Sequence, residues 1–158
     1  MYFKEFDIRW SDLDANKHLG NSTYIDYMSN TRMAFFEEQG MGLDYMTKLG
    51  IGPIALYEHI YYFKEILLGL PIQVSLEVLG YSEDYRFVQF VHNFYNTRGE
   101  NLAYSEMLFS CIDIKSRKLA TLPEEIKSKI KSFPKAKTFK ILTKEDTRRF
   151  IKKPINLN

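Results

Sequence analysis

The sequence predicts an α+β fold in which an antiparallel sheet of five to six strands packs against one long helix. Three observations indicate this. Only one segment, near the N-terminus, has the length and flanking residues of a long helix; the apolar pattern becomes strand-like after about residue 53; and the order is strand, long helix, then at least four strands. With 158 residues, 45% of them apolar and 27% charged, the chain fits one ordinary globular domain with an appended tail.

The first predicted strand covers residues 3–10, where Phe6, Ile8 and Trp10 share one face and polar residues mostly lie between them. A polar, turn-forming stretch follows over residues 11–21. This segment therefore joins the strand to the long helix through a loop rather than a tight turn.

The long helix is predicted over residues 22–39. Asn21 or Ser22 is suited to cap its start, and Gly40 to take the left-handed conformation just after its end. Its apolar residues spread beyond one narrow stripe, so we expect other elements to cover it on more than one side. One further short helical turn is expected over residues 44–49.

Four strands are predicted in the second half of the chain, over residues 53–64, 71–81, 85–96 and 102–114. The second of them alternates apolar and polar residues most regularly. Residues 96–101 contain a glycine and are suited to a hairpin loop between the last two. A run of long strands joined in this way favours an antiparallel sheet.

The C-terminal part begins with a short helix predicted over residues 123–130, with Pro123 in its first turn. We place the domain boundary after this helix, giving a domain at 1–133 and a basic extension at 134–158. The extension has a net charge of +6 and the rest of the chain −4. In the extension Thr143 begins a capping-box pattern for one more helix. Three interpretations of the basic extension stay open. It is either a solvated extension or a surface that binds the phosphates of coenzyme A or an acidic carrier protein, and contact with nucleic acid is the least favoured.

Composition restricts the class of protein. Cys111 is the single cysteine, so an internal disulfide and a zinc-finger spacing are excluded, and its apolar surroundings indicate a buried thiol. The N-terminus lacks the apolar core of a signal peptide, and no apolar run approaches the roughly 18 residues that span a bilayer. We therefore expect a cytoplasmic protein that does not enter a membrane.

His59 and His92 lie inside predicted strands and are expected to be structural, with His59, beside Glu58, the better candidate for facing a pocket.

Aromatic residues make up 15% of the chain, with 12 Phe and 11 Tyr against one Trp. This surplus is typical of a broad packed interior, an apolar ligand slot or an oligomer interface. Composition does not choose among the three.

One segment concentrates chemically active groups: Asp12, Asp14, Asn16, His18 and Asn21 lie in the loop that runs into the long helix. The unpaired N–H groups of a helix start polarise a carbonyl and stabilise a developing oxyanion. A nearby carboxylate acts on that carbonyl directly or through water. Each residue alone also fits a plain cap, turn or structural role, and two carboxylates with one histidine are a weak signal for a metal, so we expect none.

The pattern as a whole is more specific than its parts. The segment RWSDLDANKHLGNSTY over residues 9–24, with Arg32 following, resembles the signature opening of the 4-hydroxybenzoyl-CoA thioesterase-like hotdog family. The spacing Asp14-x-Asn16-x-His18 is also similar to the motif of the acyl-ACP thioesterases of that superfamily.

The resemblance covers roughly residues 1–132 and leaves the basic tail unmatched. It implies a hotdog fold, in which an antiparallel sheet wraps around one long central helix. It also implies a homodimer whose two sheets join edge to edge, with active sites at the subunit interface, or a homotetramer built from such dimers. An isolated protomer would leave a sheet edge unpaired, which agrees with this expectation.

The resemblance assigns catalytic roles to three residues. Asp14 matches the carboxylate that activates water or attacks the thioester, and Asn16 and His18 match partners that orient the substrate or that carboxylate. Whether Asp14 is a general base or a nucleophile stays open, since both need the same residue in nearly the same place.

Other positions match substrate-binding parts of the family. The backbone at Gly20 and Asn21 matches the oxyanion-binding helix start, and Tyr24 and Arg32 match pocket-lining or structural positions. Asp12 is interpreted as a determinant of the loop and the fold. Family members often carry Asn where this chain has Gly20, so a role for that side-chain amide is in doubt here.

The implied activity is hydrolysis of an acyl-CoA or acyl-ACP thioester to a free acid and a thiol, within fatty acid metabolism. CoA or the carrier protein belongs to the substrate, and no separate cofactor and no nucleic acid is expected. The alternative is a non-catalytic hotdog protein that binds acyl thioesters or another apolar ligand. A hotdog dehydratase is disfavoured because its differently arranged histidine motif is missing. Nothing in the sequence indicates the acyl group or decides between CoA and carrier protein.

Overall fold

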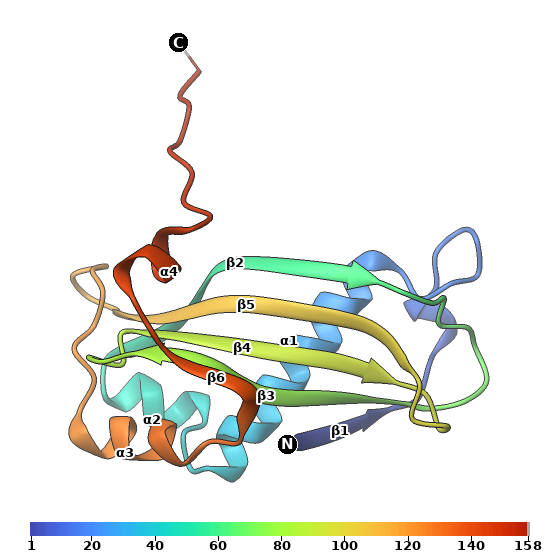
Figure 1. The fold of residues 1–158 in the computed structure, drawn as a ribbon, viewed down its shortest axis with the longest axis horizontal. Coiled ribbons are helices and arrows are strands. Elements are labelled where there is room, and N and C mark those ends of the chain that lie inside the picture. Colours follow the sequence, from blue (N-terminus) through green and yellow to red (C-terminus); the bar gives the residue numbers. More distant parts are fainter. Residues whose placement is uncertain (158) are drawn as a thin grey trace.

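The structure is a computed structural model that describes residues 1–157, so the predicted extension 134–158 is described up to its penultimate residue. Six strands form one sheet, and α1 lies across one of its faces (Figure 1). In chain order the elements are β1 Tyr2–Phe6, η1 Trp10–Asp12, α1 Asn21–Glu38, α2 Leu43–Lys48, β2 Ile51–Tyr62, β3 Ile72–Ser82, β4 Phe87–Tyr95, β5 Asn101–Asp113, α3 Glu124–Ser132, β6 Lys135–Leu142 and α4 Lys144–Arg148.

The strand order is β1-β3-β4-β5-β2, with every neighbouring pair antiparallel. β6 shares the outer edge of β3 with β1, but it runs parallel to β3, because the chain returns through α3 before entering the sheet. The predicted α+β fold, a sheet of five to six strands around one long helix, is therefore confirmed, with one parallel strand added. β2 is left as the free edge on the opposite side.

α1 spans nearly the predicted residues, but its start differs from the prediction. Asn21 and Ser22 were expected to cap it, whereas Gly20 is the N-cap and no side chain caps the helix. The prediction was wrong because the chain is already helical at Asn21. The hydroxyl of Thr23 donates instead to the carbonyl of Asp12, 3.1 Å away, and so ties the helix start to the preceding loop.

The core consists of two apolar clusters with a polar layer between them. One cluster lies under the first half of α1 and includes Tyr24 and Phe94; the other lies under its second half with α2 and α3 and includes Phe36 and Phe133. The predicted left-handed conformation of Gly40 ends the helix beside the second cluster, with φ of +64°. α1 is thus covered on more than one side, as predicted.

Arg32 is the centre of the polar layer. Its guanidinium donates to His92 Nε2 at 3.2 Å and to Ser29 Oγ at 2.9 Å, and it pairs with a Glu58 carboxylate oxygen at 3.3 Å. His92 Nδ1–H donates to the carbonyl of Ser75 at 2.7 Å. Burial, and then the charge of Arg32, lower the pKa of His92 to about 3, so this imidazole is neutral. His92 is structural, as predicted.

Two local expectations near the termini of elements were wrong. β1 ends at Phe6, and Trp10 lies in η1 with 76% of its surface exposed, because a hydrogen bond from the Arg9 N–H to the Asp12 carboxylate (2.7 Å) turns the chain out of the sheet. Pro123 is the N-cap of α3 and not part of its first turn, since its ψ of 152° is extended.

The basic extension does more than trail into solvent. Its first part is β6, and α4 with the following chain lies on the sheet face opposite α1 (Figure 1). Phe150 packs edge-on against Tyr57 and His59 of β2, with ring centroids 5.2 and 4.2 Å apart. The predicted capping box of Thr143 and Asp146 is confirmed. Within residues 1–157, no helix combines the length and hydropathy needed to cross a bilayer.

Candidate active site

The loop between η1 and α1 is a compact hairpin closed by its own backbone. The N–H of Gly20 donates to the carbonyl of Asp12, and the N–H of Asp14 donates to the carbonyl of His18, both at 2.8 Å. Lys17 makes the reversal with a φ of +63°, a left-handed conformation that is uncommon for residues other than glycine. The predicted catalytic residues are therefore held in one tight turn.

The Asp14 carboxylate is fixed by the backbone of this turn. Its Oδ1 accepts hydrogen bonds from the N–H groups of Asn16 at 2.8 Å and His18 at 3.1 Å. Asp14 is exposed, and its Oδ2 has no hydrogen-bond partner among residues 1–157. One oxygen therefore orients the group while the other faces outward, free to contact water or a ligand.

The carboxylate of Asp12, two residues before Asp14, has other hydrogen-bond partners. It accepts the N–H of Arg9 at 2.7 Å and the hydroxyl of Tyr27 at 2.8 Å. Burial and the Asp12 carboxylate raise the pKa of Tyr27, which keeps that hydroxyl a donor. The interpretation of Asp12 as a determinant of the loop and the fold agrees with these contacts.

His18 pairs with a residue that the sequence analysis did not consider. Its Nε2 lies 2.9 Å from a carboxylate oxygen of Glu65, in the segment between β2 and β3. The backbone fixes this pairing: Leu19 N–H donates to the Ile66 carbonyl at 2.8 Å, and His18 forms a β-bridge with Leu67. No local pattern points to Glu65, because 47 positions separate it from His18 and only the packing of the two loops brings them together.

The start of α1 lies directly after this turn. Since the Gly20 N–H is occupied by the Asp12 carbonyl, the N–H groups of Asn21 and Ser22 are the ones without an intrahelical acceptor. They point from the positive end of the helix dipole. Of the backbone predicted to bind an oxyanion, the N–H groups of Asn21 and Ser22 are therefore available as donors, whereas that of Gly20 is already occupied.

Tyr24 lies about one helical turn after Asn21, and its side chain is buried. Its ring meets that of Tyr62 edge-on, with centroids 4.9 Å apart. Burial, then Tyr62, then the Asp14 charge raise the pKa of Tyr24 to about 12. The hydroxyl is therefore neutral and able to donate, close enough to Asp14 to be influenced by its charge. The loop between η1 and α1 and the start of α1, which carry the predicted site residues, lie at one end of the molecule (Figure 1).

Arg32 is not part of this cluster. The sequence left it as pocket-lining or structural, and the structure places it in the buried polar layer, where Glu58 and His92 occupy its donors. Tyr24 and Arg32 are nonetheless on the same helix, eight residues apart.

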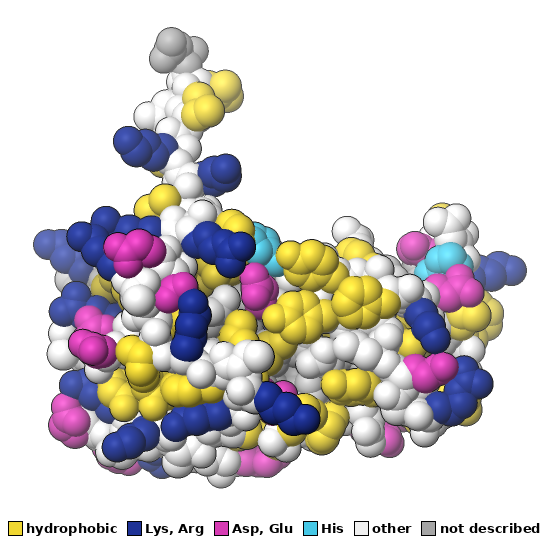
Figure 2. Space-filling view, viewed as in Figure 1, with side chains coloured by type: hydrophobic (Ala, Val, Ile, Leu, Met, Phe, Trp, Pro, Cys, Tyr) yellow, Lys and Arg dark blue, Asp and Glu magenta, His cyan; other side chains and the backbone are white. Residues whose placement is uncertain are grey.

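Apolar side chains are exposed beside the site. Figure 2 shows a group of them in the middle of the sheet face, and basic side chains gathered towards the C-terminal extension. Large apolar residues that are more than a third exposed near the end of β2 and in the following segment are Tyr61, Tyr62, Phe63, Leu67, Leu68 and Leu70. A patch of this kind is typical of a surface that another molecule covers.

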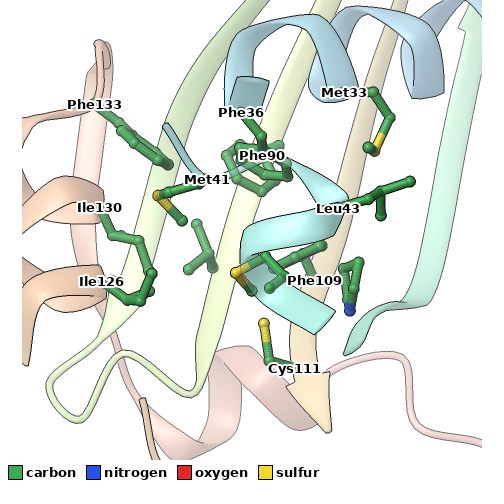
Figure 3. Close-up of a pocket in the computed structure, with 13 residues that line it drawn as sticks. Met33, Phe36, Met41, Leu43, Phe90, Phe109, Cys111, Ile126, Ile130 and Phe133 are labelled. Atoms are coloured by element: carbon green, nitrogen blue, oxygen red, sulfur yellow. The ribbon is translucent and has the colours of Figure 1, made fainter. Parts of the chain in front are cut away.

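An enclosed apolar cavity lies at the opposite end of the molecule, between α1, α2, α3 and the sheet (Figure 3). Cys111 lines it and is only 5% exposed, which confirms the prediction of a buried core cysteine, and this burial raises the pKa of the thiol to about 12. Residues 1–157 contain no cluster of three His, Cys, Asp or Glu side chains arranged as metal ligands.

The model of the thioesterase-like superfamily matches residues 8–130, which contain the whole loop, α1, α2, the four strands from β2 to β5 and most of α3. None of the curated protein sequences matches the chain.

Solved structures, two of the following three named as thioesterases, have the same fold. The hypothetical protein SAV2348 of Staphylococcus aureus in complex with CoA is 21% identical, with a TM-score of 0.77 over 96% of this chain and 94% of its own. The DHNA-CoA thioesterase of the same organism is 20% identical, with a TM-score of 0.73 over 82% and 90%. A 1,4-dihydroxy-2-naphthoyl-CoA thioesterase of Synechocystis is 15% identical, with a TM-score of 0.74 over 83% and 96%.

Proposed function

Because this chain belongs to the thioesterase-like superfamily, we propose that it hydrolyses an acyl-CoA thioester to a free acid and a thiol, with Asp14 as the central carboxylate. The proposal rests mainly on the hydrogen bonding of that carboxylate. Two backbone N–H groups hold Oδ1, Oδ2 has no hydrogen-bond partner among residues 1–157, and the turn that carries Asp14 runs directly into the start of α1. A carboxylate and an oxyanion-binding helix start are the two groups that acyl transfer to water needs.

The thioester carbonyl would lie against the start of α1. There the N–H groups of Asn21 and Ser22 would donate hydrogen bonds to the thioester oxygen as negative charge develops on it, assisted by the helix dipole. Losing one such donor in acyl-transfer sites costs on the order of 3 kcal/mol. The exposure of Asn21 allows a ligand to reach this position.

Asp14 has two chemically balanced routes. As a general base it takes a proton from water, whose oxygen bonds to the carbonyl carbon; the C–S bond then breaks, and the thiolate receives the proton. As a nucleophile its Oδ2 bonds to that carbon as the C–S bond breaks and the thiolate leaves; water then hydrolyses the resulting anhydride, restores the Asp14 carboxylate and supplies the proton that the thiolate takes up. Both routes yield the acid and the thiol.

Asn16, His18 and Tyr24 would then orient the reacting groups. The Asn16 side chain is exposed, so it is free to contact a ligand. His18 lies in the same turn as Asp14 and offers a ring nitrogen, and Tyr24, whose pKa the Asp14 charge helps to raise, offers a neutral hydroxyl. We assign them to positioning the thioester and its leaving sulfur.

CoA is favoured over acyl carrier protein as the leaving group. The similar structure of the hypothetical protein SAV2348 holds CoA, and that likeness extends over 96% of this chain, so it includes most of the basic extension. The likeness to the two structures named as thioesterases covers 82% and 83% of this chain. The extension offers Lys and Arg side chains suited to phosphates.

We also propose that the active form is a homodimer joined through β2. This strand is the free edge of the sheet, and an unpaired edge beside exposed apolar side chains favours pairing with a second copy. Light scattering after size exclusion is expected to give about twice 18.7 kDa, or four times that mass for a tetramer. A mass of one chain would contradict the proposal.

The test of the activity is thiol release from a panel of acyl-CoA thioesters, short to long and aliphatic to aromatic. We expect turnover of some members, and its fall by about 10²–10⁴ in Asp14→Asn. Absence of turnover, with acyl-CoA binding retained by the folded protein, would favour the non-catalytic binder. Turnover by Asp14→Asn equal to that of the original chain would overturn the assignment of Asp14.

A further inference from the structure

The candidate site contains a second carboxylate, Glu65, which no motif indicates. We propose that Glu65 is a positioning residue: it fixes the ring orientation and the tautomer of His18, so that Nδ1 is presented as a hydrogen-bond acceptor. This inference rests on the proposed function of the loop, but its structural part holds independently of turnover.

The first support is the contact itself. His18 Nε2 lies 2.9 Å from a Glu65 carboxylate oxygen, and an ionised carboxylate only accepts hydrogen bonds. Nε2 must therefore carry the proton, and in the neutral ring Nδ1 then carries the lone pair. A carboxylate that holds one ring nitrogen of a histidine, leaving the other for the reacting groups, is the arrangement by which acidic partners orient catalytic histidines.

The second support is that backbone hydrogen bonds, independent of the side-chain contact, fix the positions of His18 and Glu65. Phe63 and Lys64 both donate their N–H groups to the Leu102 carbonyl, at 2.9 and 3.0 Å. On the other side of Glu65, the Ile66 carbonyl accepts the N–H of Leu19, a residue that is only 4% exposed. Glu65 thus lies between two anchored neighbours, so the fold already supplies the backbone ordering that the pair requires.

The third support is a comparison of acidic residues in the same region. Glu100 lies beside Lys64 and accepts hydrogen bonds from Lys64, Asn96 and Arg98, all within the sheet end and its hairpin. Glu65 contacts no lysine or arginine among residues 1–157; its one ionic partner is His18. Among these two acidic residues, Glu65 is therefore the one that contacts the loop carrying Asp14.

The test uses the three histidines of the chain as separate reporters. Long-range ¹H–¹⁵N spectra of the imidazole nitrogens, recorded at about pH 8.5 where an ordinary imidazole is neutral, distinguish the two tautomers. We expect His18 in the Nε2–H form and His92 in the Nδ1–H form. In Glu65→Ala, His18 should shift towards a mixture of tautomers, while His92 stays unchanged and confirms that the protein is folded.

Kinetics supply the second readout. We expect kcat of Glu65→Ala to fall about tenfold to a hundredfold, with KM changed by less than about threefold, because a positioning partner acts on the reacting geometry. Glu65→Gln, which keeps an acceptor oxygen, should recover part of the loss. The matched control is Glu100→Gln, which removes one nearby negative charge and should alter neither kcat nor the His18 spectrum.

Two results would overturn the proposal: a His18 ring that is Nδ1-protonated in the original chain, or a His18 spectrum and kcat that are the same in Glu65→Ala as in Glu100→Gln. If no thioester is hydrolysed at all, the proposed function fails, but the tautomer of His18 still decides whether Glu65 fixes the ring.

Discussion

His18 and His92 show how one residue type serves two purposes in this chain. His92 is completely buried between a cation, Arg32, and a backbone carbonyl, and its pKa falls to about 3. His18 lies in an exposed turn against a carboxylate, with 41% of its side chain accessible. Burial beside a cation leaves an imidazole neutral and enclosed, whereas partial exposure beside a carboxylate leaves one ring nitrogen available for chemistry.

The two regions also differ in what holds them. Side chains from α1, β2 and β4 meet directly in the buried layer, so its geometry depends on Arg32, Glu58 and His92 themselves. In the loop, backbone N–H groups hold the Asp14 carboxylate. We therefore expect substitutions in the layer to change stability, and conservative substitutions in the loop to change activity.

The largest expected effect on stability is in the buried layer. Arg32→Met leaves the Glu58 carboxylate without its cation and should lower the free energy of unfolding by about 3–5 kcal/mol, measured by urea denaturation. The double variant Arg32→Met with Glu58→Met should recover much of this loss, since no unpaired charge then remains. A single variant as stable as the original chain would show that the layer contributes little.

His92 should make the stability of the folded chain depend on pH. Unfolded chains protonate histidine near pH 6.5, but the folded chain holds His92 neutral down to about pH 3, because of burial and the Arg32 charge. Between these values the unfolded state binds more protons, so stability falls as the pH falls, by up to about 1.4 kcal/mol per pH unit; above pH 6.5 the contribution is constant. Urea titrations between about pH 7 and 4 should give a shallower slope for His92→Asn. Equal slopes for both proteins would contradict the assignment.

A smaller effect is expected where the loop meets the helix. Tyr27→Phe removes the hydroxyl that donates to Asp12 at 2.8 Å and should cost about 1.5–3 kcal/mol of stability. The Asp14 contacts are not touched, so kcat per folded molecule should stay within about threefold of the original. A larger fall in kcat without a fall in stability would mean that Tyr27 acts in the reaction.

The smallest effect is expected far from both regions. Thr143→Ala removes the side-chain oxygen that accepts the Asp146 N–H at 3.2 Å and should destabilise α4 by about 1 kcal/mol. Hydrogen exchange of the α4 amides should rise while turnover stays the same. Unchanged hydrogen exchange of the α4 amides would contradict the prediction, and a rise in KM for acyl-CoA would support the proposed contact of the extension with the phosphates of CoA.

The sequence predicted what depends on local patterns. The 22–39 helix, four strands and the Asp14-x-Asn16-x-His18 turn were found close to their predicted positions, because periodicity and turn residues specify them directly. Asn21 as a cap and Trp10 in the strand were wrong because the contacts of Asp12 with Thr23 and Arg9 set the chain path there.

Contacts between distant segments were beyond such patterns. Glu65 meets His18, and Glu58 meets Arg32, only because β2 ends beside the loop and runs along α1. The parallel pairing of β6 with β3 likewise depends on how α3 returns the chain. A basic composition at 134–158 gave no indication of a strand in the sheet.

The most direct test of the central claim compares two carboxylates of one loop. In Asp14→Asn, the remaining side-chain oxygen still accepts the two backbone N–H groups, so stability should change by less than about 1 kcal/mol, while turnover falls by about 10²–10⁴. In Asp12→Asn, stability should fall by about 1–3 kcal/mol, and turnover per folded molecule should stay within about threefold. Equal turnover by Asp14→Asn and the original chain, or an equally large loss of turnover in both variants, would contradict the account.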